Sequence, residues 1–214
     1  MSKGVTARRV WDISQTLRPG LPVWPGDTPF ALERTWRMEN GSPVNVARLT
    51  LSTHSGTHGD APLHYAASGA DAAGMSLDHY IGECLVVDAT AVRGRAVGVE
   101  DLPDIAGVER VLLRTFAAFP HGEWRGDFTA VAPETIGHLA ERGVRLIGTD
   151  APSLDPQDSA AMAAHKAVLA ADMRILEGLV LEGVPPGRYE LIALPLKIAG
   201  GDAGLCRAVL RELA

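Results

Sequence analysis

Arg145-Leu-Ile-Gly-Thr-Asp150 is a short apolar run that comes soon after a helical pattern, Pro133-Glu-Thr-Ile-Gly-His-Leu-Ala-Glu-Arg142. Proline suits the first turn of a helix, and Gly143 directly after Arg142 is a typical C-terminal signal. An earlier apolar run, Arg110-Val-Leu-Leu-Arg-Thr115, is bounded by breakers and is typical of a buried strand. This succession decides the fold class, because alternating strands and helices indicate an α/β sheet with helices packed against it.

The same alternation continues toward the C-terminus. Ser159 to Ala170 is predicted to be a helix with Asp158 as its N-cap, because aspartate accepts hydrogen bonds from the first backbone amides. Arg174 to Leu181 and Tyr189 to Leu196 are predicted strands, and Cys206 to Leu213 is a closing helix or a final strand.

The N-terminal part is predicted to contain a hairpin. Phe30 to Met38 and Val44 to Leu51 alternate apolar and polar residues, and Glu39-Asn-Gly-Ser-Pro43 supplies the turn between them. Arg9 to Ser14 is predicted to be a short opening strand, and Gly82 to Asp88 a buried one. The expected fold is therefore α/β, with a mixed sheet and packed helices.

Composition and charge exclude several classes of protein. No repeat or linker interrupts the 214 residues, so one domain spanning residues 1–214 is predicted. The formal net charge of −6 argues against a nucleic-acid surface, which needs a basic patch. No apolar stretch reaches the length of a membrane span, and the N-terminus lacks the apolar centre of a signal peptide. Cys84 and Cys206 lie too far apart in sequence to suggest a thiolate metal site. We therefore expect a cytoplasmic protein that binds neither nucleic acid nor membrane.

The chemistry is concentrated in His54-Ser-Gly-Thr-His58-Gly-Asp60-Ala-Pro62-Leu-His64, which holds three of the 7 histidines of the chain. Imidazole and carboxylate are ligands of zinc and manganese. Because glycine and proline disfavour a helix here, we predict a tight loop that brings His54, His58 and Asp60 to one metal ion. His64 is the remaining member, and the ordinary pKa of histidine suits an acid–base residue.

Other residues have two interpretations. Asp60 has two oxygens, so it could bridge a second ion if further ligands came from elsewhere in the chain. Glu177 lies on an otherwise apolar strand face, so it must be paired with an arginine or bound to a metal. His165 is an exposed helical histidine or a second-metal ligand, and Trp24 is a core anchor or a face for stacking a substrate. The residues alone leave these alternatives open.

The histidine segment resembles His-x-Gly-Thr-His-x-Asp-x-Pro-x-His, the signature of the metal-dependent cyclase-like hydrolases. Further segments resemble the bacterial kynurenine formamidases, or arylformamidases, among them Pro22-Val-Trp-Pro-Gly-Asp-Thr-Pro-Phe30, Asp155-Pro-Gln-Asp158 and His165-Lys-Ala-Val-Leu169. The resemblance spans nearly the whole chain. It implies a swivelling β/α/β fold, a homodimer and the hydrolysis of N-formyl-L-kynurenine to L-kynurenine and formate.

The resemblance also implies a two-metal site, usually with two zinc ions per subunit, in which manganese or another divalent metal is also accepted. His54, His58 and Asp60 match the ligands of the first metal. Asp60 and Glu177 match the bridging carboxylates, and His165 matches a ligand of the second metal.

By the same resemblance, His64 matches the proton donor and acceptor, and Trp24 matches an aromatic substrate contact. One departure is Gly204-Leu205, which stands where the family tends to have Ser-Pro, so the shape of that substrate loop is open. Two alternative functions remain. The same machinery could act on a related aryl or cyclic amide such as isatin, or the ligands could form a structural metal site without activity.

Overall fold

The computed structural model describes residues 8–213, which form eleven strands and two α-helices. The strands are β1 (Val10–Asp12), β2 (Ala31–Trp36), β3 (Val46–Thr50), β4 (His58–Asp60), β5 (Ile81–Asp88), β6 (Arg110–Arg114), β7 (Leu146–Thr149), β8 (Arg174–Glu177), β9 (Gly187–Ala193), β10 (Ala203–Leu205) and β11 (Ala208–Arg211). The helices are α1 (Pro133–Glu141) and α2 (Ala163–Ala170), with single 3-10 turns at η1 (Met38–Asn40), η2 (Pro62–His64), η3 (Leu77–His79) and η4 (Val99–Asp101).

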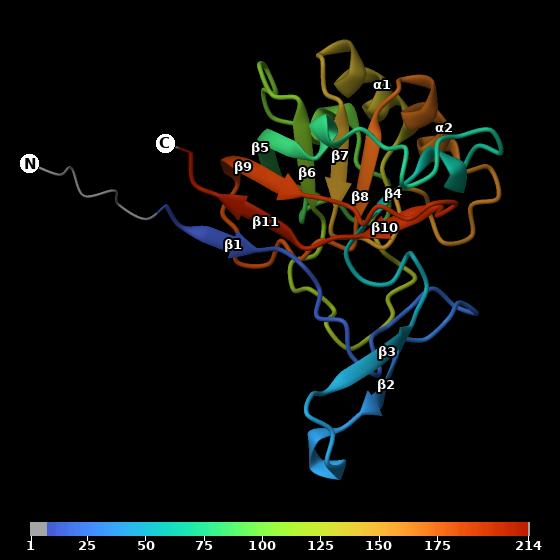
Figure 1. The fold of residues 1–214 in the computed structure, drawn as a ribbon. Helices are drawn as coiled ribbons and strands as arrows, with labels where there is room; N and C mark the ends of the chain where they lie inside the picture. The colour runs from blue at the N-terminus through green and yellow to red at the C-terminus, as the bar shows by residue number, and fades with distance from the viewer. Residues whose placement is uncertain (1–7, 214) are drawn as a thin grey trace, which may run out of the picture.

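Nine of the strands form one mixed sheet in the order β1-β11-β9-β5-β6-β7-β8-β4-β10 (Figure 1). The four central strands, β5 to β8, are parallel, and the strands on either side pair antiparallel. Helix α1 connects β6 to β7, and α2 connects β7 to β8. The predicted α/β fold with a mixed sheet and packed helices is confirmed.

The sheet separates two apolar cores. Successive side chains of a strand point to opposite faces, so Val111 and Leu113 of β6 pack under α1 and α2, while Leu112 packs on the other face. Ile136 of α1 and Val168 of α2 close the first core and are fully buried. Burying a side chain of this size stabilises the fold by about 1.5–3 kcal/mol. The helices are therefore fixed against the parallel strands.

Helix α2 begins later than the sequence pattern predicted, and Asp158 is not its N-cap. The N-cap is Met162, and the carboxylate of Asp155 accepts hydrogen bonds from the backbone amides of Ala164 and His165 at 3.0 and 3.1 Å. The first amides of a helix need an acceptor outside the helix. Asp155, which precedes the loop of residues 156–162, supplies this acceptor. The helix therefore begins at Ala163, and the predicted start at Ser159 was wrong.

Strand β8 ends at Glu177 and not at Leu181, so the predicted alternation was wrong beyond that residue. Gly178 turns the chain with a φ of 63°, and a Cβ there would lie 2.4 Å from the carbonyl oxygen of Gly56. Only glycine fits such a close approach of two backbones. Leu179 then packs in the core on the face away from the helices. Glu177 is thereby left at the carboxyl end of a parallel strand, where ligand sites of α/β sheets lie.

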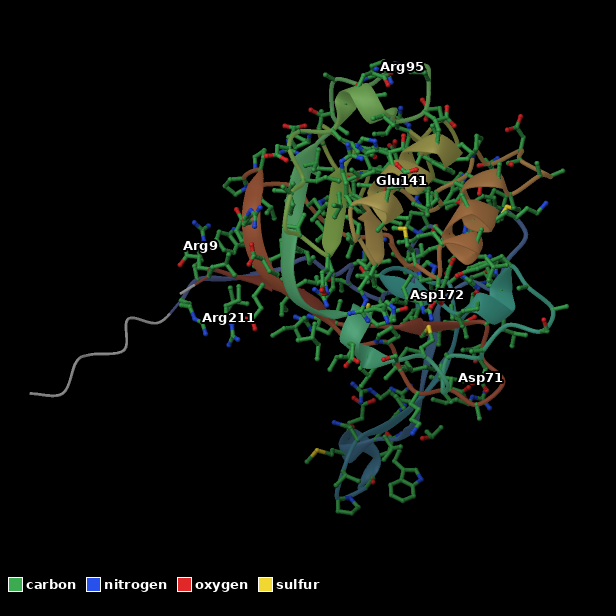
Figure 2. The ribbon with its side chains drawn as sticks, turned by 90° about the horizontal axis from the view of Figure 1, so that it is seen from above. Arg9, Asp71, Arg95, Glu141, Asp172 and Arg211 are labelled. Carbon is green, nitrogen blue, oxygen red and sulfur yellow. The ribbon has the colours of Figure 1, made fainter. Side chains whose placement is uncertain are left out.

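Strands β2 and β3 form the predicted hairpin, which we call the arm (residues 31–50). It pairs antiparallel with a register shift between Arg34 and Trp36, and every residue of both strands is exposed. Figures 1 and 2 show the arm projecting from the rest of the molecule. At the other end of the chain, the closing element is a strand, β11, and the short strand β10 before it had no sequence signal. Within residues 8–213, no helix is long and apolar enough to cross a bilayer.

Candidate metal centre and substrate cavity

Two of the predicted metal ligands lie on strand β4 and not in a tight loop. β4 is held between β8 and β10, with His58 opposite Glu177 and Asp60 opposite Ala203. Residues two apart on a strand share a face, so His58 and Asp60 point the same way. The loop prediction was wrong for these two residues because pairing on both sides keeps the segment extended. His54 reaches them from the turn before β4, where Gly56 adopts a φ of 66°.

Three ligand atoms from this segment form a small triangle. His54 Nδ1 lies 3.1 Å from His58 Nε2, and each of these nitrogens lies 3.2 Å from Asp60 Oδ1. A tetrahedral ion with bonds of about 2.1 Å holds its ligand atoms about 3.4 Å apart. The spacing therefore fits a single divalent metal ion between the three side chains.

In His54 and His58, the ring nitrogen that lies outside the triangle fixes the tautomer. Nδ1 of His58 lies 3.0 Å from the carbonyl oxygen of Gly56, and Nε2 of His54 lies 3.3 Å from Asp202 Oδ2. Carbonyl and carboxylate oxygens only accept, so these ring nitrogens are the donors. In the neutral rings, the lone pairs of both histidines then point at one another. Metal-binding histidines commonly have such acceptors behind them.

Asp60 provides a direct test of whether a metal fits. Both of its carboxylate oxygens are fully buried and receive no hydrogen bond from residues 8–213. Three imidazoles face them, but not with the angles of hydrogen bonds. A buried carboxylate that accepts no well-directed hydrogen bond is costly even beside ion-pair partners. A cation between Asp60 and these rings satisfies the carboxylate, so the residues present fit a divalent metal.

A second set of ligand atoms lies on the other side of Asp60. Nε2 of His165 is 3.4 Å from Asp60 Oδ2 and 3.7 Å from Glu177 Oε1. Glu177 Oε2 is 3.6 Å from Nε2 of His58, and Oε1 accepts the backbone N–H of Leu154 at 2.9 Å. Asp60 thus faces both histidines of the first set and His165 of the second. Glu177 faces His58 on one side and His165 on the other. The arginine pair considered for Glu177 is absent from the described residues, and His165 is buried, not exposed.

The charges at this centre are tightly coupled. Burial would raise the pKa of Asp60, but the three facing histidines outweigh it and keep the pKa well below its usual value. Burial, followed by the Asp60 charge, raises the pKa of Glu177. Burial would lower the pKa of both His54 and His165, but their carboxylate partners raise it to about 9 and about 10. Without metal, protons on the histidines therefore balance the buried carboxylates.

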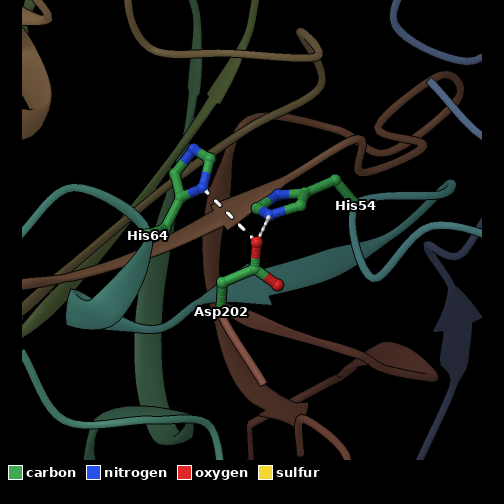
Figure 3. Close-up of side chains that lie close together, drawn as sticks. All are labelled: His54, His64 and Asp202. Atoms are coloured by element: carbon green, nitrogen blue, oxygen red, sulfur yellow. Dashed lines mark hydrogen bonds and ion pairs between the residues drawn. The ribbon is translucent and has the colours of Figure 1, made fainter. Parts of the chain in front are cut away.

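His64 lies beside this centre and not within the triangle. Its ring centroid is 4.2 Å from that of His54 and 5.9 Å from that of His165. Nδ1 of His64 lies 3.9 Å from Asp202 Oδ2. Figure 3 shows both histidine rings facing this carboxylate. Burial lowers the pKa of His64, which keeps the ring neutral at pH 7. The ring is one-third exposed, so it is open to a molecule that approaches the centre.

A cavity of about 560 Å³ opens over the centre. The histidines and Glu177 form its floor. Part of its wall is aromatic and is formed by Trp24, Trp124, Phe116 and Phe119. The ring of Trp24 packs edge-on against Trp124, with ring centroids 5.4 Å apart, and against Phe128 behind the wall at 6.3 Å. Trp124 donates to Gln157 at 2.7 Å, which holds its ring in place. Trp24 therefore lines the cavity and does not serve only as a core anchor.

Residues 11–156 match the model of the putative cyclase family. The chain belongs to this family. It is 69% identical over 213 residues to the kynurenine formamidase of Erythrobacter litoralis, covering 100% of this chain and 98% of the relative. It is 56% identical over 207 residues to the kynurenine formamidase of Sphingopyxis alaskensis, covering 96% and 99%.

Solved structures agree with this assignment. A potential metal-dependent hydrolase with cyclase activity superimposes with a TM-score of 0.84 at 31% identity, covering 97% of this chain and 100% of that one. Isatin hydrolase A from Ralstonia solanacearum superimposes with a TM-score of 0.81 at 26% identity, covering 96% and 92%.

The structure brings together every residue that the sequence singled out for metal or acid–base chemistry: His54, His58, Asp60, His64, His165 and Glu177. Sequence reasoning missed Asp155 and Asp202. Asp155 has no local signal, although it lies in a segment that resembles the family. Asp202 lies next to the Gly204-Leu205 departure, and only the pairing of β10 with β4 brings it to the site.

Proposed function

We propose that this protein is a kynurenine formamidase, which hydrolyses N-formyl-L-kynurenine to L-kynurenine and formate. The full-length similarity to kynurenine formamidases carries the proposal. The geometry supports it, because a centre of histidines and buried carboxylates lies at the bottom of a cavity whose wall includes aromatic rings. The residues 1–214 are proposed to act as one hydrolase domain on the linear amide bond of a small-molecule substrate.

We propose two zinc ions as the metals. His54, His58 and Asp60 would hold the first, and Asp60, His165 and Glu177 the second, with Asp60 as the bridge. Two ligand sets on opposite oxygens of one buried carboxylate support this arrangement. Divalent metals at such sites activate water near neutral pH and polarise a carbonyl oxygen.

His64 is proposed as the acid–base residue. Its lowered pKa leaves the ring neutral at pH 7, so it enters the reaction as a base and takes a proton from the attacking water. The protonated ring then gives this proton to the aryl nitrogen of the leaving group. An aryl amide nitrogen leaves poorly without a proton, so both transfers fall to the same residue. Its position beside His54 supports the assignment.

Trp24 is proposed to hold the aromatic ring of the substrate. Edge-on packing against Trp124 fixes the plane of the Trp24 ring, and aromatic pairs of this kind contribute about 0.5–1.5 kcal/mol beyond their burial. A substrate ring in contact with Trp24 lies in the same cavity as the metal ligands. The formyl group is thereby directed toward the floor of the cavity.

The test is hydrolysis by purified protein with its metal content measured on the same sample. We expect zinc at two ions per chain and a kcat/KM for N-formyl-L-kynurenine far above that for isatin. A higher kcat/KM for isatin would transfer the function to cyclic amides. A metal-loaded protein that hydrolyses no formanilide would instead identify a structural metal site.

We also propose that the enzyme is a homodimer formed through the arm. Large apolar side chains are exposed there, with Trp36 57% and Leu49 51% exposed, and such patches commonly mark interfaces. Sedimentation velocity should give a dimer for the wild type and a monomer for the double variant Trp36→Ser and Leu49→Ser. Leu77→Ser, which changes an exposed leucine elsewhere, is the control. A monomeric wild type would refute the assembly.

A further inference from the structure

Asp202 is fixed at the edge of the metal centre by the backbone. It directly precedes β10, whose Ala203 pairs with Asp60, and its carbonyl oxygen accepts the N–H of Ala61 at 2.9 Å. At Gly204, a Cβ would lie 2.7 Å from the carbonyl oxygen of Leu196, so this strand is enclosed on its other side as well. The position of the Asp202 side chain is therefore set by the same strand pairing that sets Asp60.

The two oxygens of the Asp202 carboxylate have different partners. Oδ1 accepts the hydroxyl of Thr53 at 2.6 Å, which fixes the plane of the carboxylate. Oδ2 then faces two imidazoles, with Nε2 of His54 at 3.3 Å and Nδ1 of His64 at 3.9 Å (Figure 3). Among the described residues, Asp202 is the carboxylate within 4 Å of His64. One oxygen is therefore shared by a proposed metal ligand and the proposed acid–base residue.

This sharing has a chemical consequence for both rings. A hydrogen bond at Nε2 of His54 keeps the proton on that nitrogen and leaves Nδ1 free to bind metal. The same oxygen lies 3.9 Å from Nδ1 of His64, beyond hydrogen-bond distance, so only its charge favours a proton on that nitrogen. A proton there would leave Nε2 of His64 to exchange protons with substrate. The two rings also lie against each other, with centroids 4.2 Å apart. A displacement of the carboxylate would thus disturb both.

We propose that Asp202 is a positioning residue that holds the metal ligand His54 and the acid–base residue His64 in one arrangement through a single carboxylate oxygen. The inference rests on the proposed function for the role of His64. It assigns Asp202 no contact with substrate, because Asp202 is not among the residues that line the cavity.

The test uses Asp202→Ala and Asp202→Asn in the full-length protein. Zinc affinity, measured by competition with a chelator, should fall roughly 10- to 100-fold in Asp202→Ala, the usual effect of removing a partner of a metal-bound histidine. Asp202→Asn keeps an oxygen that accepts from His54, so its loss of affinity should be smaller. With zinc at saturation, kcat for N-formyl-L-kynurenine should stay reduced in both variants while KM changes little, because His64 has lost its carboxylate.

Asp71→Asn is the matched control. Its carboxylate accepts the backbone amides of Gly74 and Gly200 at 2.8 and 2.7 Å, so it anchors the loop before Asp202 and has no hydrogen bond or ion pair with either histidine. It should leave zinc affinity and kcat near wild type. Equal losses of zinc affinity and kcat in Asp71→Asn and Asp202→Asn would overturn the proposal, because Asp202 would then act only by holding its loop in place.

A double-mutant cycle isolates the effect on His64. In a His64→Ala background at saturating zinc, Asp202→Ala should cause no further loss of kcat. If the losses of kcat in His64→Ala and Asp202→Ala were fully additive, the shared role would be overturned. Recovery of the full wild-type kcat by Asp202→Ala at saturating zinc would also overturn it. A wild-type protein that does not hydrolyse N-formyl-L-kynurenine would refute the proposed function, whereas unchanged zinc affinity in Asp202→Ala would refute this inference by itself.

Discussion

The carboxylate of Asp155 lies 2.6 Å from Nδ1 of His165 and also caps the helix on which His165 stands. The ring nitrogen is the donor of this pair, because a carboxylate only accepts. Nε2 of His165 is therefore left facing Asp60. One buried side chain sets both the start of α2 and the orientation of His165 in its first turn, which couples the stability of the helix to the proposed metal centre.

Asp155→Ala should therefore weaken metal binding and stability together. Loss of the partner of His165 should lower the affinity for the second metal roughly 10- to 100-fold, and loss of the cap should reduce the free energy of unfolding by about 1 kcal/mol. Chelator competition and urea unfolding of the metal-free protein measure the two effects. The exposed Asp158 offers a control, because Asp158→Ala removes a carboxylate from the same loop without touching α2. Comparable losses of metal affinity and of unfolding free energy in Asp155→Ala and Asp158→Ala would contradict the proposed role of Asp155.

His64 and Asp60 should separate activity from metal binding. His64→Ala should keep its zinc and lose turnover by about 10²- to 10⁴-fold, the range for removal of an acid–base residue. Asp60→Ala should lose zinc, because its carboxylate faces both sets of histidines. Metal analysis and kcat on the same preparations check this division. Equal loss of zinc in the two variants would show that His64 is a ligand.

Local sequence was sufficient for much of the fold and for half of the site. The helix α1 and the hairpin of β2 and β3 follow from signals within a few residues, namely Pro133, Gly143 and the Asn-Gly turn. The close approach of His54, His58 and Asp60 could also be predicted from local sequence, because it needs only one turn and one short strand.

What the sequence could not predict depends on contacts between distant segments. Asp202 reaches the site only because β10 pairs with β4, and Asp155 replaces Asp158 as the cap because the intervening loop folds back on α2. Strand β8 ends early because Gly178 packs against the backbone of Gly56, more than a hundred residues away. Neither propensity nor periodicity describes such contacts. The resemblance to a known family, and not spacing, implied that His165 is a ligand of the second metal.

Metal binding should release protons, and its affinity should rise with pH. Carboxylate partners raise the pKa of His54 to about 9 and that of His165 to about 10, so both rings carry a proton in the metal-free protein at pH 7. Zinc must displace these protons. As the pH rises toward 9, less work is needed to remove them, and apparent affinity increases. Calorimetry in buffers of different ionisation enthalpy measures the number of protons released. Zinc binding at pH 7 without proton release would contradict the prediction.

Asp150 should act on substrate affinity through the aromatic wall of the cavity. Its buried carboxylate accepts the N–H and hydroxyl of Thr115 at 2.8 and 2.6 Å and the N–H of Phe116 at 3.1 Å, which fixes the start of the loop that carries Trp124. Burial raises the pKa of Asp150 to about 6 despite these bonds, so the group is ionised at pH 7. In Asp150→Asn, the amide NH₂ must face a backbone donor, at a cost of about 1–3 kcal/mol.

We therefore expect Asp150→Asn to lower the free energy of unfolding and to raise KM for N-formyl-L-kynurenine, with zinc content unchanged. Thr115→Val, which removes only the hydroxyl donor, should give a smaller change in the same direction. Asp127→Asn on the exposed side of the same loop should leave KM near wild type, because within residues 8–213 the Asp127 side chain pairs only with Arg125. A fall in kcat with unchanged KM in Asp150→Asn would place its effect on the proposed metal centre and not on the wall that is proposed to hold the substrate ring.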